Sequence, residues 1–282
     1  MPILSIQSHV AYGHVGNSSA VFPLQRRGHE VWPIHTVQFA AHTGYGPPKG
    51  RVFDAAMIDE VMEGIAARPD FMTCRAVLSG YMGSVEMGGA IVRAVQQVKE
   101  ANPSALYCCD PVMGDVGRGL FVRPDMPDFI RAHVVPAADI LTPNLFELEV
   151  LSGLVCADVT TVRRAFDAVH ALGPRMILLT SGATPETAPD RFDLLASDTA
   201  GVWRVRTPRI DVSPNGAGDL VAALFLSSYL RTGSVAEALG FAASAVHGVV
   251  QATYDAHSPE LLLIEAQNEY ISPSHVFEPE LL

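Results

Sequence analysis

The amino-acid sequence predicts a single α/β domain built on a doubly wound, mostly parallel β-sheet with an antiparallel edge. Short apolar runs alternate with helical patterns from one end of the chain to the other, which is typical of a parallel sheet with helices on both faces. Two late apolar runs lie close enough together to form a hairpin. No linker-like or low-complexity segment divides the chain, so we expect one domain over residues 1–282.

The predicted strands are short and apolar, and each ends in polar residues or glycine. They cover residues 3–7, 30–37, 76–79, 105–109, 139–141 and 176–180. Strands at 192–196 and 202–206, separated by Ser-Asp-Thr-Ala-Gly, predict the antiparallel edge. Helices are expected from near residue 16, over residues 85–99, 217–230 and 235–251, and briefly after residue 259. Ligands bind such sheets beyond the carboxyl ends of the strands, so the residues that follow each strand are the candidates for chemistry.

Composition and charge argue against several classes of protein. The formal net charge of −11 argues against a nucleic-acid surface. We expect no membrane span, because no apolar stretch approaches the required length, and no signal peptide, because the apolar run after Met1 is too short. The four cysteines lack the spacing of a zinc site and are interpreted as reduced core thiols. The predicted compartment is the cytoplasm.

Several common catalytic motifs are missing from the sequence. Lys49 and Lys99 are the only lysines, and neither follows a glycine loop at the start of a helix. This excludes a P-loop and disfavours a lysine Schiff-base enzyme. HExxH, GxSxG and GxGxxG motifs in a supporting context are absent as well.

The strongest local feature is the segment Asn215-Gly216-Ala217-Gly218-Asp219, which precedes an apolar helix. Glycines at a helix start let the backbone approach a ligand, and the free N–H groups with the positive dipole end form an anion site. Asp219 can act there as a base on an attacking hydroxyl while the amides of Gly216, Ala217 and Gly218 hold the developing charge. The alternative is a plain helix start with a favourable first-turn carboxylate.

Two other strand ends carry acidic residues. Asn144 and Glu147 fit a capping box at the start of a helix. They also fit a phosphate site in which Glu147 holds Mg²⁺ through waters. Asp110 directly follows a predicted strand, where it either binds metal or caps a turn.

Polar clusters end the first two predicted strands. One is Ser-Ile-Gln-Ser-His at residues 5–9, and the other runs over residues 37–46 with Phe39, His42 and Thr43. A flat, partly polar ring ligand would suit the second cluster. A loop with incidental histidines is the alternative.

Taken in order, these segments resemble the pyridoxal kinases of the ribokinase-like superfamily. The matching segments are 5–9, 16–17, 37–39 with 42–43, 79–81, 109–115 and 139–147. Each is weak alone, but the ordered set is specific, and the resemblance runs from residue 3 to about residue 251. It implies a three-layer ribokinase-like fold, a homodimer, and transfer of the ATP γ-phosphate to the 5′-hydroxyl of pyridoxal or a related B6 vitamer.

The resemblance also implies roles for individual residues. Asp219 would be the general base beside Gly216, Ala217 and Gly218. The vitamer would be contacted by Ser8, Phe39, His42, Thr43 and Tyr81. The nucleotide and its metal would be surrounded by Asp110, Asp115, Asn144, Glu147, Thr180 and Ser181, with Asp110 and Glu147 toward the metal. Mg²⁺ would accompany ATP, and a monovalent cation, K⁺ or Na⁺, would assist.

The sequence departs from the family pattern at two places, and two other functions are alternatives to this interpretation. Many family members have threonine at the position of Ala217, and losing one such donor costs on the order of ten- to a thousandfold in rate. The dipeptide Pro214-Asn215 before the loop also differs from the pattern.

The alternative functions are a hydroxymethylpyrimidine kinase of the same fold, which segments 5–9 and 37–39 disfavour, and a catalytically weak pyridoxal-binding protein. A sugar kinase is disfavoured because no early pair of carboxylates is suited to grip sugar hydroxyls.

Overall fold

The computed structural model describes residues 1–182, 184 and 187–282 of the chain. Within the described residues, ten strands form one sheet in the order β12-β11-β10-β9-β8-β5-β4-β1-β2-β3. Their bounds are β1 Pro2–Val10, β2 Glu30–Phe39, β3 Gly50–Val52, β4 Ala76–Ser79, β5 Leu106–Cys109, β8 Ile140–Leu141, β9 Met176–Leu179, β10 Arg191–Asp198, β11 Gly201–Pro208 and β12 Glu280–Leu281. The strands from β2 through β9 in this order pair in parallel, and β3, β10, β11 and β12 pair antiparallel at the two edges.

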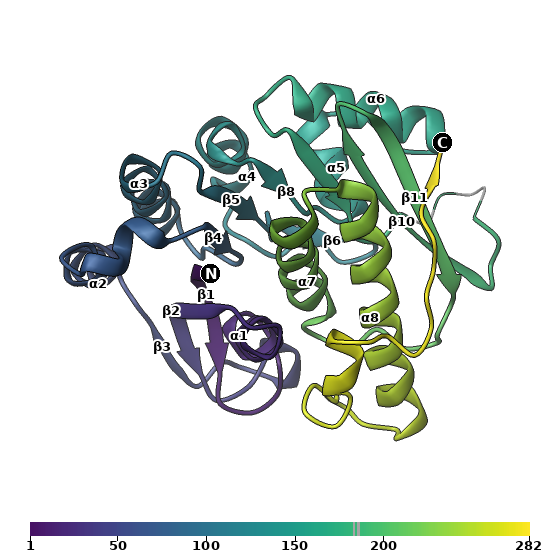
Figure 1. Cartoon of the computed structure of the whole chain (residues 1–282), viewed down its shortest axis with the longest axis horizontal. Coiled ribbons are helices and arrows are strands. Elements are labelled where there is room, and N and C mark those ends of the chain that lie inside the picture. Colours follow the sequence, from purple (N-terminus) through teal and green to yellow (C-terminus); the bar gives the residue numbers. More distant parts are fainter. Residues whose placement is uncertain (183, 185–186) are drawn as a thin grey trace.

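Helices cover both faces of the sheet, giving three layers (Figure 1). They are α1 Asn17–Arg26, α2 Ala55–Ala66, α3 Val85–Ala101, α4 Met126–Phe129, α5 Leu145–Ser152, α6 Val159–His170, α7 Ala217–Thr232 and α8 Val235–Asp255. Short 3₁₀ segments lie at Thr43–Tyr45, Pro69–Thr73, Val135–Ala137 and Gln267–Tyr270, with a π-helical turn at Ile130–Val134. A separate two-stranded hairpin joins β6 Gly114–Asp115 to β7 Gly119–Leu120.

The hydrophobic core has two parts because the sheet buries both faces. Along β1, Leu4 and Ile6 pack into the part under α2 to α6, whereas Ile3 packs into the part under α1, α7 and α8. Successive side chains of a strand point to opposite faces, so a strand buried on both sides is apolar without alternation. This explains why the predicted strands read as continuous apolar runs.

The structure confirms the predicted parallel strands and the hairpin. Helix α7 begins at Ala217 as expected, and α8 begins at Val235 and extends four residues beyond the predicted end. The short helical tail expected after residue 259 is mostly wrong: turns lead to the 3₁₀ segment Gln267–Tyr270, and the tail then pairs with β11 through β12. The four cysteines are free and buried, as predicted.

Helix α8 corrects one expectation about membranes. By length and composition alone it could cross a bilayer, which the sequence analysis did not anticipate. In its most apolar stretch, however, 61% of the residues are buried inside the molecule, and it packs beside α7 against β10 and β11. Helix α8 is therefore a core helix of this fold.

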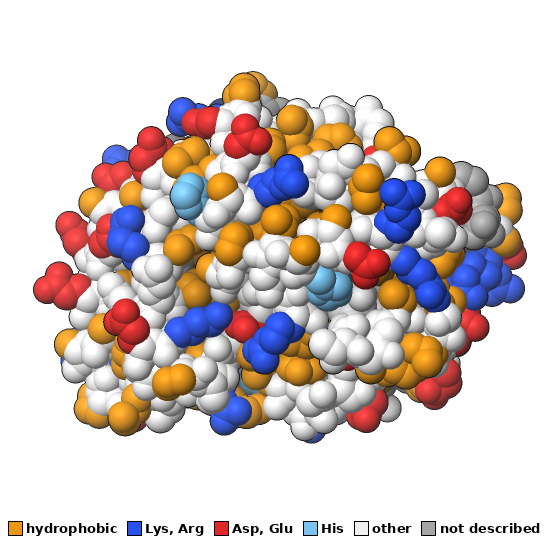
Figure 2. Space-filling view, turned by 90° about the horizontal axis from the view of Figure 1, so that it is seen from above, with side chains coloured by type: hydrophobic (Ala, Val, Ile, Leu, Met, Phe, Trp, Pro, Cys, Tyr) orange, Lys and Arg blue, Asp and Glu red, His pale blue; other side chains and the backbone are white. Residues whose placement is uncertain are grey.

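On the face shown in Figure 2, acidic and basic side chains are interspersed among apolar side chains.

Candidate active site

The loop before helix α7 is held in place by the first strand's loop. Gly216 is the N-cap of α7 and has a left-handed φ of +85°. A Cβ there would lie 1.7 Å from the carbonyl oxygen of His14, and Ser19 Oγ donates a 2.9 Å hydrogen bond to the Gly216 carbonyl. Only glycine combines this conformation with this contact. The start of α7 is thus fixed against the loop after β1 and the first turn of α1, and its first N–H groups are free for an anion in the cavity that this loop lines.

Asp219 lies in the first turn of α7 and is only partly exposed. Burial raises the pKa of its carboxyl to about 6, while the backbone amides of Gly16 and of Asp219 itself hold the pKa lower. A carboxylate with a pKa just below neutrality is ionised at pH 7 yet basic enough to take a proton in a transition state. The predicted base has the electrostatic setting that this role requires.

Asp110 and Glu147 lie close enough to influence each other's ionisation. Asp110 is 8% exposed at the end of β5, and burial, followed by the charges of Glu147 and Asp219, raises the pKa of its carboxyl well above the ordinary range. Burial raises the pKa of Glu147 to about 7, although backbone amides that donate to it oppose this shift. Buried carboxylates without a positive partner are costly, so this group favours a bound cation.

Asn144 and Glu147 form the predicted capping box, and the same side chains remain candidates for the phosphate and metal site. Asn144 Oδ1 accepts from the Glu147 N–H and Glu147 Oε2 accepts from the Asn144 N–H, each at 2.9 Å, which is a capping box. Glu147 Oε1 also accepts from Met113 N–H at 2.9 Å, and Asn144 Nδ2 donates to the Gly114 carbonyl at 2.8 Å. The cap therefore fixes the carboxylate that faces Asp110.

Thr142 is a further candidate site residue, with no role predicted from the sequence. Because Cys109 pairs with Leu141 in the parallel register of β5 and β8, Asp110 and Thr142 follow on neighbouring strands. Thr142 is 1% exposed, and its hydroxyl lies close enough to the Asp110 carboxyl to lower the pKa of that group. A buried hydroxyl beside a buried carboxylate offers a cation two neighbouring oxygens. Its signal in the sequence was its place at a strand end.

No three His, Cys, Asp or Glu side chains converge to chelate an ion directly in the part of the chain that the structure describes. This arrangement fits Mg²⁺, which keeps several waters and binds through one or two carboxylates together with substrate phosphates. Asp110 and Glu147 therefore fit a magnesium site completed by a nucleotide, and do not fit a closed structural metal site.

A cavity of about 600 Å³ opens beside the Gly216 loop, between the β10–β11 hairpin and helix α8. The predicted nucleotide residues Asp115, Asn144, Thr180 and Ser181 line it together with Gly216, Ala217 and Gly218. Its other wall is largely apolar and is formed by Phe192, Leu194, Pro208, Ile210, Val212, Val221, Ala243, Val246 and Val250. None of these wall residues was a predicted site residue, because apolar periodicity predicts burial and does not distinguish a core residue from one that lines a cavity.

The five predicted vitamer residues lie near the carboxyl ends of β1, β2 and β4, which are neighbours in the sheet. They are Ser8, Phe39, His42, Thr43 and Tyr81, and none of them lines the cavity described above. Gly16 packs directly on Ser8, and the position of a Cβ on Gly44 lies 3.9 Å from Asn215 Nδ2. The vitamer residues therefore meet the Gly216 loop from the β1 side, and the cavity meets the same loop from the α8 side.

Glu260, which follows α8, joins two loops on the vitamer side. Tyr45 OH donates to Glu260 Oε1 at 2.6 Å, and the His14 N–H donates to Oε2 at 3.0 Å. The hydrogen bond raises the pKa of Tyr45 to about 12. Gly13, with φ +86°, leaves the space that the carboxylate fills. Because these partners are over two hundred residues apart, no local pattern in the sequence reveals this contact.

Replacing Asp110 by Asn is expected to stabilise the ligand-free protein at pH 8, with a rise in Tm of roughly 2–4 °C for ~1 kcal/mol. The pKa of Asp110 is raised in the folded state, so its ionised form opposes folding above that pKa, and the opposition fades as the pH falls toward the unfolded value near pH ~4. Calorimetric melting of both proteins from pH 8 to pH 4 checks this, with exposed Asp128→Asn as control. A destabilised variant at pH 8 would show that a partner already compensates Asp110.

The chain matches known proteins both in sequence and in structure. A family model described as phosphomethylpyrimidine kinase matches residues 49–260. The chain is 50% identical to pyridoxal kinase PdxY of Corynebacterium diphtheriae over 99% of both chains, and 51% identical to pyridoxal kinase PdxY of Granulibacter bethesdensis over the full length of both. Its structure matches that of pyridoxal kinase from Leishmania donovani in complex with ADP and pyridoxamine, with a TM-score of 0.91 and 30% identity over 100% of this chain and 99% of that one.

These matches cover the whole chain, including the Gly216 loop and the strand ends on both sides of it. The sheet order, with its antiparallel edge and helices on both faces, is the ribokinase-like fold of these relatives. By sequence and by structure, the chain belongs to the pyridoxal kinase family, a family of phosphotransferases.

Proposed function

We propose that the protein is a pyridoxal kinase that transfers the γ-phosphate of ATP to the 5′-hydroxyl of pyridoxal. The position of Asp219 carries this proposal. Its carboxyl, with a pKa raised to about 6, lies in the first turn of α7. The loop that begins this helix faces the 600 Å³ cavity on one side and the loop after β1 on the other. A base in that position can take the proton of a hydroxyl that approaches from the β1 side as it attacks a phosphate bound in the cavity.

One orientation of ATP in the cavity is proposed from its lining. The apolar wall that α8 contributes, with Ala243, Val246 and Val250, suits the purine. The phosphates would extend toward Asn144, Thr180 and Ser181 and end at the amides of Gly216, Ala217 and Gly218. A helix N-terminus with uncovered amides stabilises negative charge there.

The cations have a separate place at the strand ends. Mg²⁺ bound with ATP supplies charge neutralisation of the phosphates, and Asp110 and Glu147 would hold it through waters. A monovalent cation, K⁺ or Na⁺, would suit the buried Asp110 carboxylate and the buried Thr142 hydroxyl beside it. Asp115 is exposed on the β6–β7 hairpin and lines the cavity, where it faces the nucleotide.

The chemical step is a single displacement. Ser8, Phe39, His42, Thr43 and Tyr81 would orient the vitamer ring so that its 5′-hydroxyl points at the γ-phosphate. Asp219 accepts the hydroxyl proton as the new O–P bond forms and the bond to the bridging oxygen breaks, releasing ADP. The helix amides hold the charge on the transferred group.

Turnover on separate substrates tests this proposal. Purified protein with MgATP and K⁺ is offered pyridoxal, pyridoxine, pyridoxamine or hydroxymethylpyrimidine, and ADP and phosphorylated product are measured. We expect turnover on pyridoxal with one ADP per product. Vitamer binding without turnover with any metal would overturn the proposal and indicate a pyridoxal-binding protein disabled at Ala217.

A hydroxymethylpyrimidine kinase is the second candidate, because the matching family model is described as phosphomethylpyrimidine kinase. The same assay separates the two functions, since turnover on the pyrimidine alone would select this one. The single-domain organisation is also a proposal, supported by a sheet that takes strands from both ends of the chain. The homodimer and the cytoplasmic location stay predictions.

A further inference from the structure

Arg118 is the one lysine or arginine among the described residues that line the 600 Å³ cavity. The site otherwise gathers acidic groups: Asp110, Asp115, Glu147 and Asp219. The chain's two lysines lie elsewhere, since Lys99 pairs with Asp139 at 2.8 Å and Lys49 lies in the exposed loop before β3. A triphosphate entering this cavity would therefore meet one side-chain cation.

The charge of Arg118 acts on the vitamer side as well as on the cavity that Arg118 lines. Burial is the main cause that lowers the pKa of His42, but the nearby charge of Arg118 lowers it too, against the opposing charge of Glu260. Arg118 thus lines the nucleotide cavity and also acts electrostatically on a predicted vitamer residue. It forms no ion pair with a described residue, so its charge is available to a ligand.

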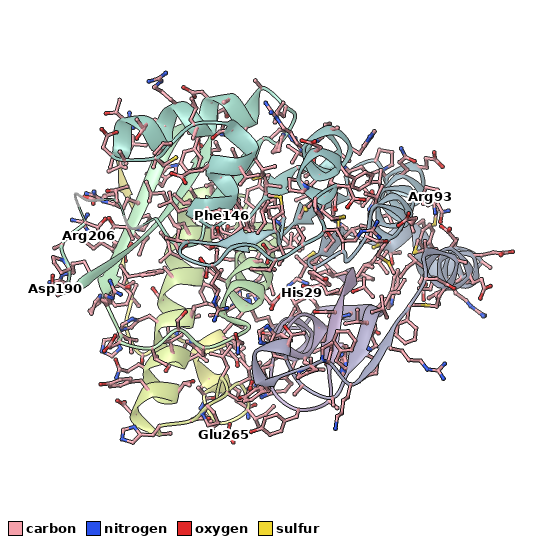
Figure 3. All side chains as sticks on the ribbon, turned by 180° about the vertical axis from the view of Figure 1, so that it is seen from behind. His29, Arg93, Phe146, Asp190, Arg206 and Glu265 are labelled. Atoms are coloured by element: carbon pink, nitrogen blue, oxygen red, sulfur yellow. The ribbon has the colours of Figure 1, made fainter. Side chains whose placement is uncertain are left out.

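The β6–β7 hairpin that carries Arg118 is anchored at its base and exposed at its tip. The Asn144 side chain donates to the Gly114 carbonyl at 2.8 Å, and the ring of Phe146 on α5 packs where a Gly114 side chain would be; Phe146 is labelled in Figure 3. Gly117 and Gly119 flank Arg118 with φ of +80° and +70°, and a Cβ on either glycine would meet no atom within 4 Å. The hairpin is thus anchored at its base, and the open space at the two glycines leaves room for Arg118 to reach a phosphate in the cavity that it lines.

We propose that Arg118 contacts the phosphates of ATP and neutralises the charge on the γ-phosphoryl group as it passes to the acceptor hydroxyl. The inference rests on the proposed function and adds a catalytic residue to it. Arginine suits the task because its planar fork binds phosphate oxygens in pairs and its charge persists at every working pH. In this site it takes the place that a lysine holds in many other kinases.

The test compares Arg118→Gln and Arg118→Lys with Arg123→Gln. Arg123 follows the same hairpin, is exposed, pairs with Asp125 at 3.3 Å and does not line the cavity. We expect kcat to fall about 100-fold in Arg118→Gln and to recover partly in Arg118→Lys, with KM for pyridoxal unchanged. Added guanidinium should restore part of the lost rate in Arg118→Gln, which a structural role would not produce. Arg123→Gln should match the parent protein.

A second measurement keeps this proposal separate from the proposed function. Calorimetric affinities for adenosine, ADP and the β,γ-imido analogue of ATP need no turnover. We expect Arg118→Gln to weaken the binding of the analogue more than the binding of ADP and to leave the affinity for adenosine unchanged. This expectation holds even if pyridoxal is not the acceptor. Equal affinities for all three ligands in Arg118→Gln and the parent, or a kcat within about 3-fold of the parent, would overturn the proposal.

Discussion

Asp219→Asn is expected to lower turnover of pyridoxal by a factor on the order of 10³ while both ligands still bind. Asparagine keeps the shape of the side chain but cannot take a proton from the 5′-hydroxyl. The pKa of about 6 that burial gives Asp219 is matched to a general base. Steady-state kcat, with dissociation constants for pyridoxal and ADP from calorimetry, checks both halves of the expectation.

The pH dependence of the parent enzyme supplies an independent readout of the same residue. Since Asp219 must be ionised to act, kcat/KM should be flat above neutrality and fall about tenfold per pH unit below about pH 6. The residual activity of Asp219→Asn should lack this limb. Asp211→Asn, an exposed residue just before the same loop, is the matched control for the charge change. Turnover of Asp219→Asn close to that of the control would contradict the assignment of the base.

Gly216→Ala is expected to remove most activity, by more than about 100-fold, because it displaces the amides that are proposed to bind the phosphates. The new methyl group would sit 1.7 Å from the His14 carbonyl oxygen, at a φ of +85° that alanine rarely adopts. Backbone there must shift, at a cost of roughly 1–3 kcal/mol in stability. Steady-state kinetics and calorimetric melting measure both effects.

The chain provides a control two residues away. A Cβ on Gly218 meets nothing within 4 Å, and Gly218 does not have a left-handed φ. Gly218→Ala keeps the same N–H group and adds the same methyl group, so we expect a far smaller loss in rate and in Tm. Equal losses in the two variants would mean that the packing of Gly216 against His14 does not determine the loop's geometry.

The parts of the fold that were predictable have local causes. Ile3, Leu4 and Ile6 are apolar without strict alternation because β1 is buried on both faces, and the capping pattern of Asn144 and Glu147 marks the start of α5. The edge strand β3 was missed because Gly50, Arg51 and Val52 are exposed. The two-residue strands β6, β7 and β12 are too short to have a period of their own.

The candidate site was predictable where residues follow strands, and less so elsewhere. Asp110, Asn144 and Thr180 follow three adjacent strands, so the sheet order brings them together. Val246 and Val250 have ordinary helical periodicity, and only the tertiary structure shows that they line a cavity. Glu260 and Arg118 gain their surroundings from distant segments, which one sequence does not reveal.

Following labelled phosphate from ATP tests the central claim most directly. Protein is incubated with pyridoxal, MgATP carrying a labelled γ-phosphate and K⁺, and the label is located by chromatography and mass spectrometry. We predict that the label appears in pyridoxal 5′-phosphate in equal amount to the ADP released, at a rate that falls by a factor on the order of 10³ in Asp219→Asn. Label found only in ATP or in inorganic phosphate, with pyridoxal unchanged, would contradict the account.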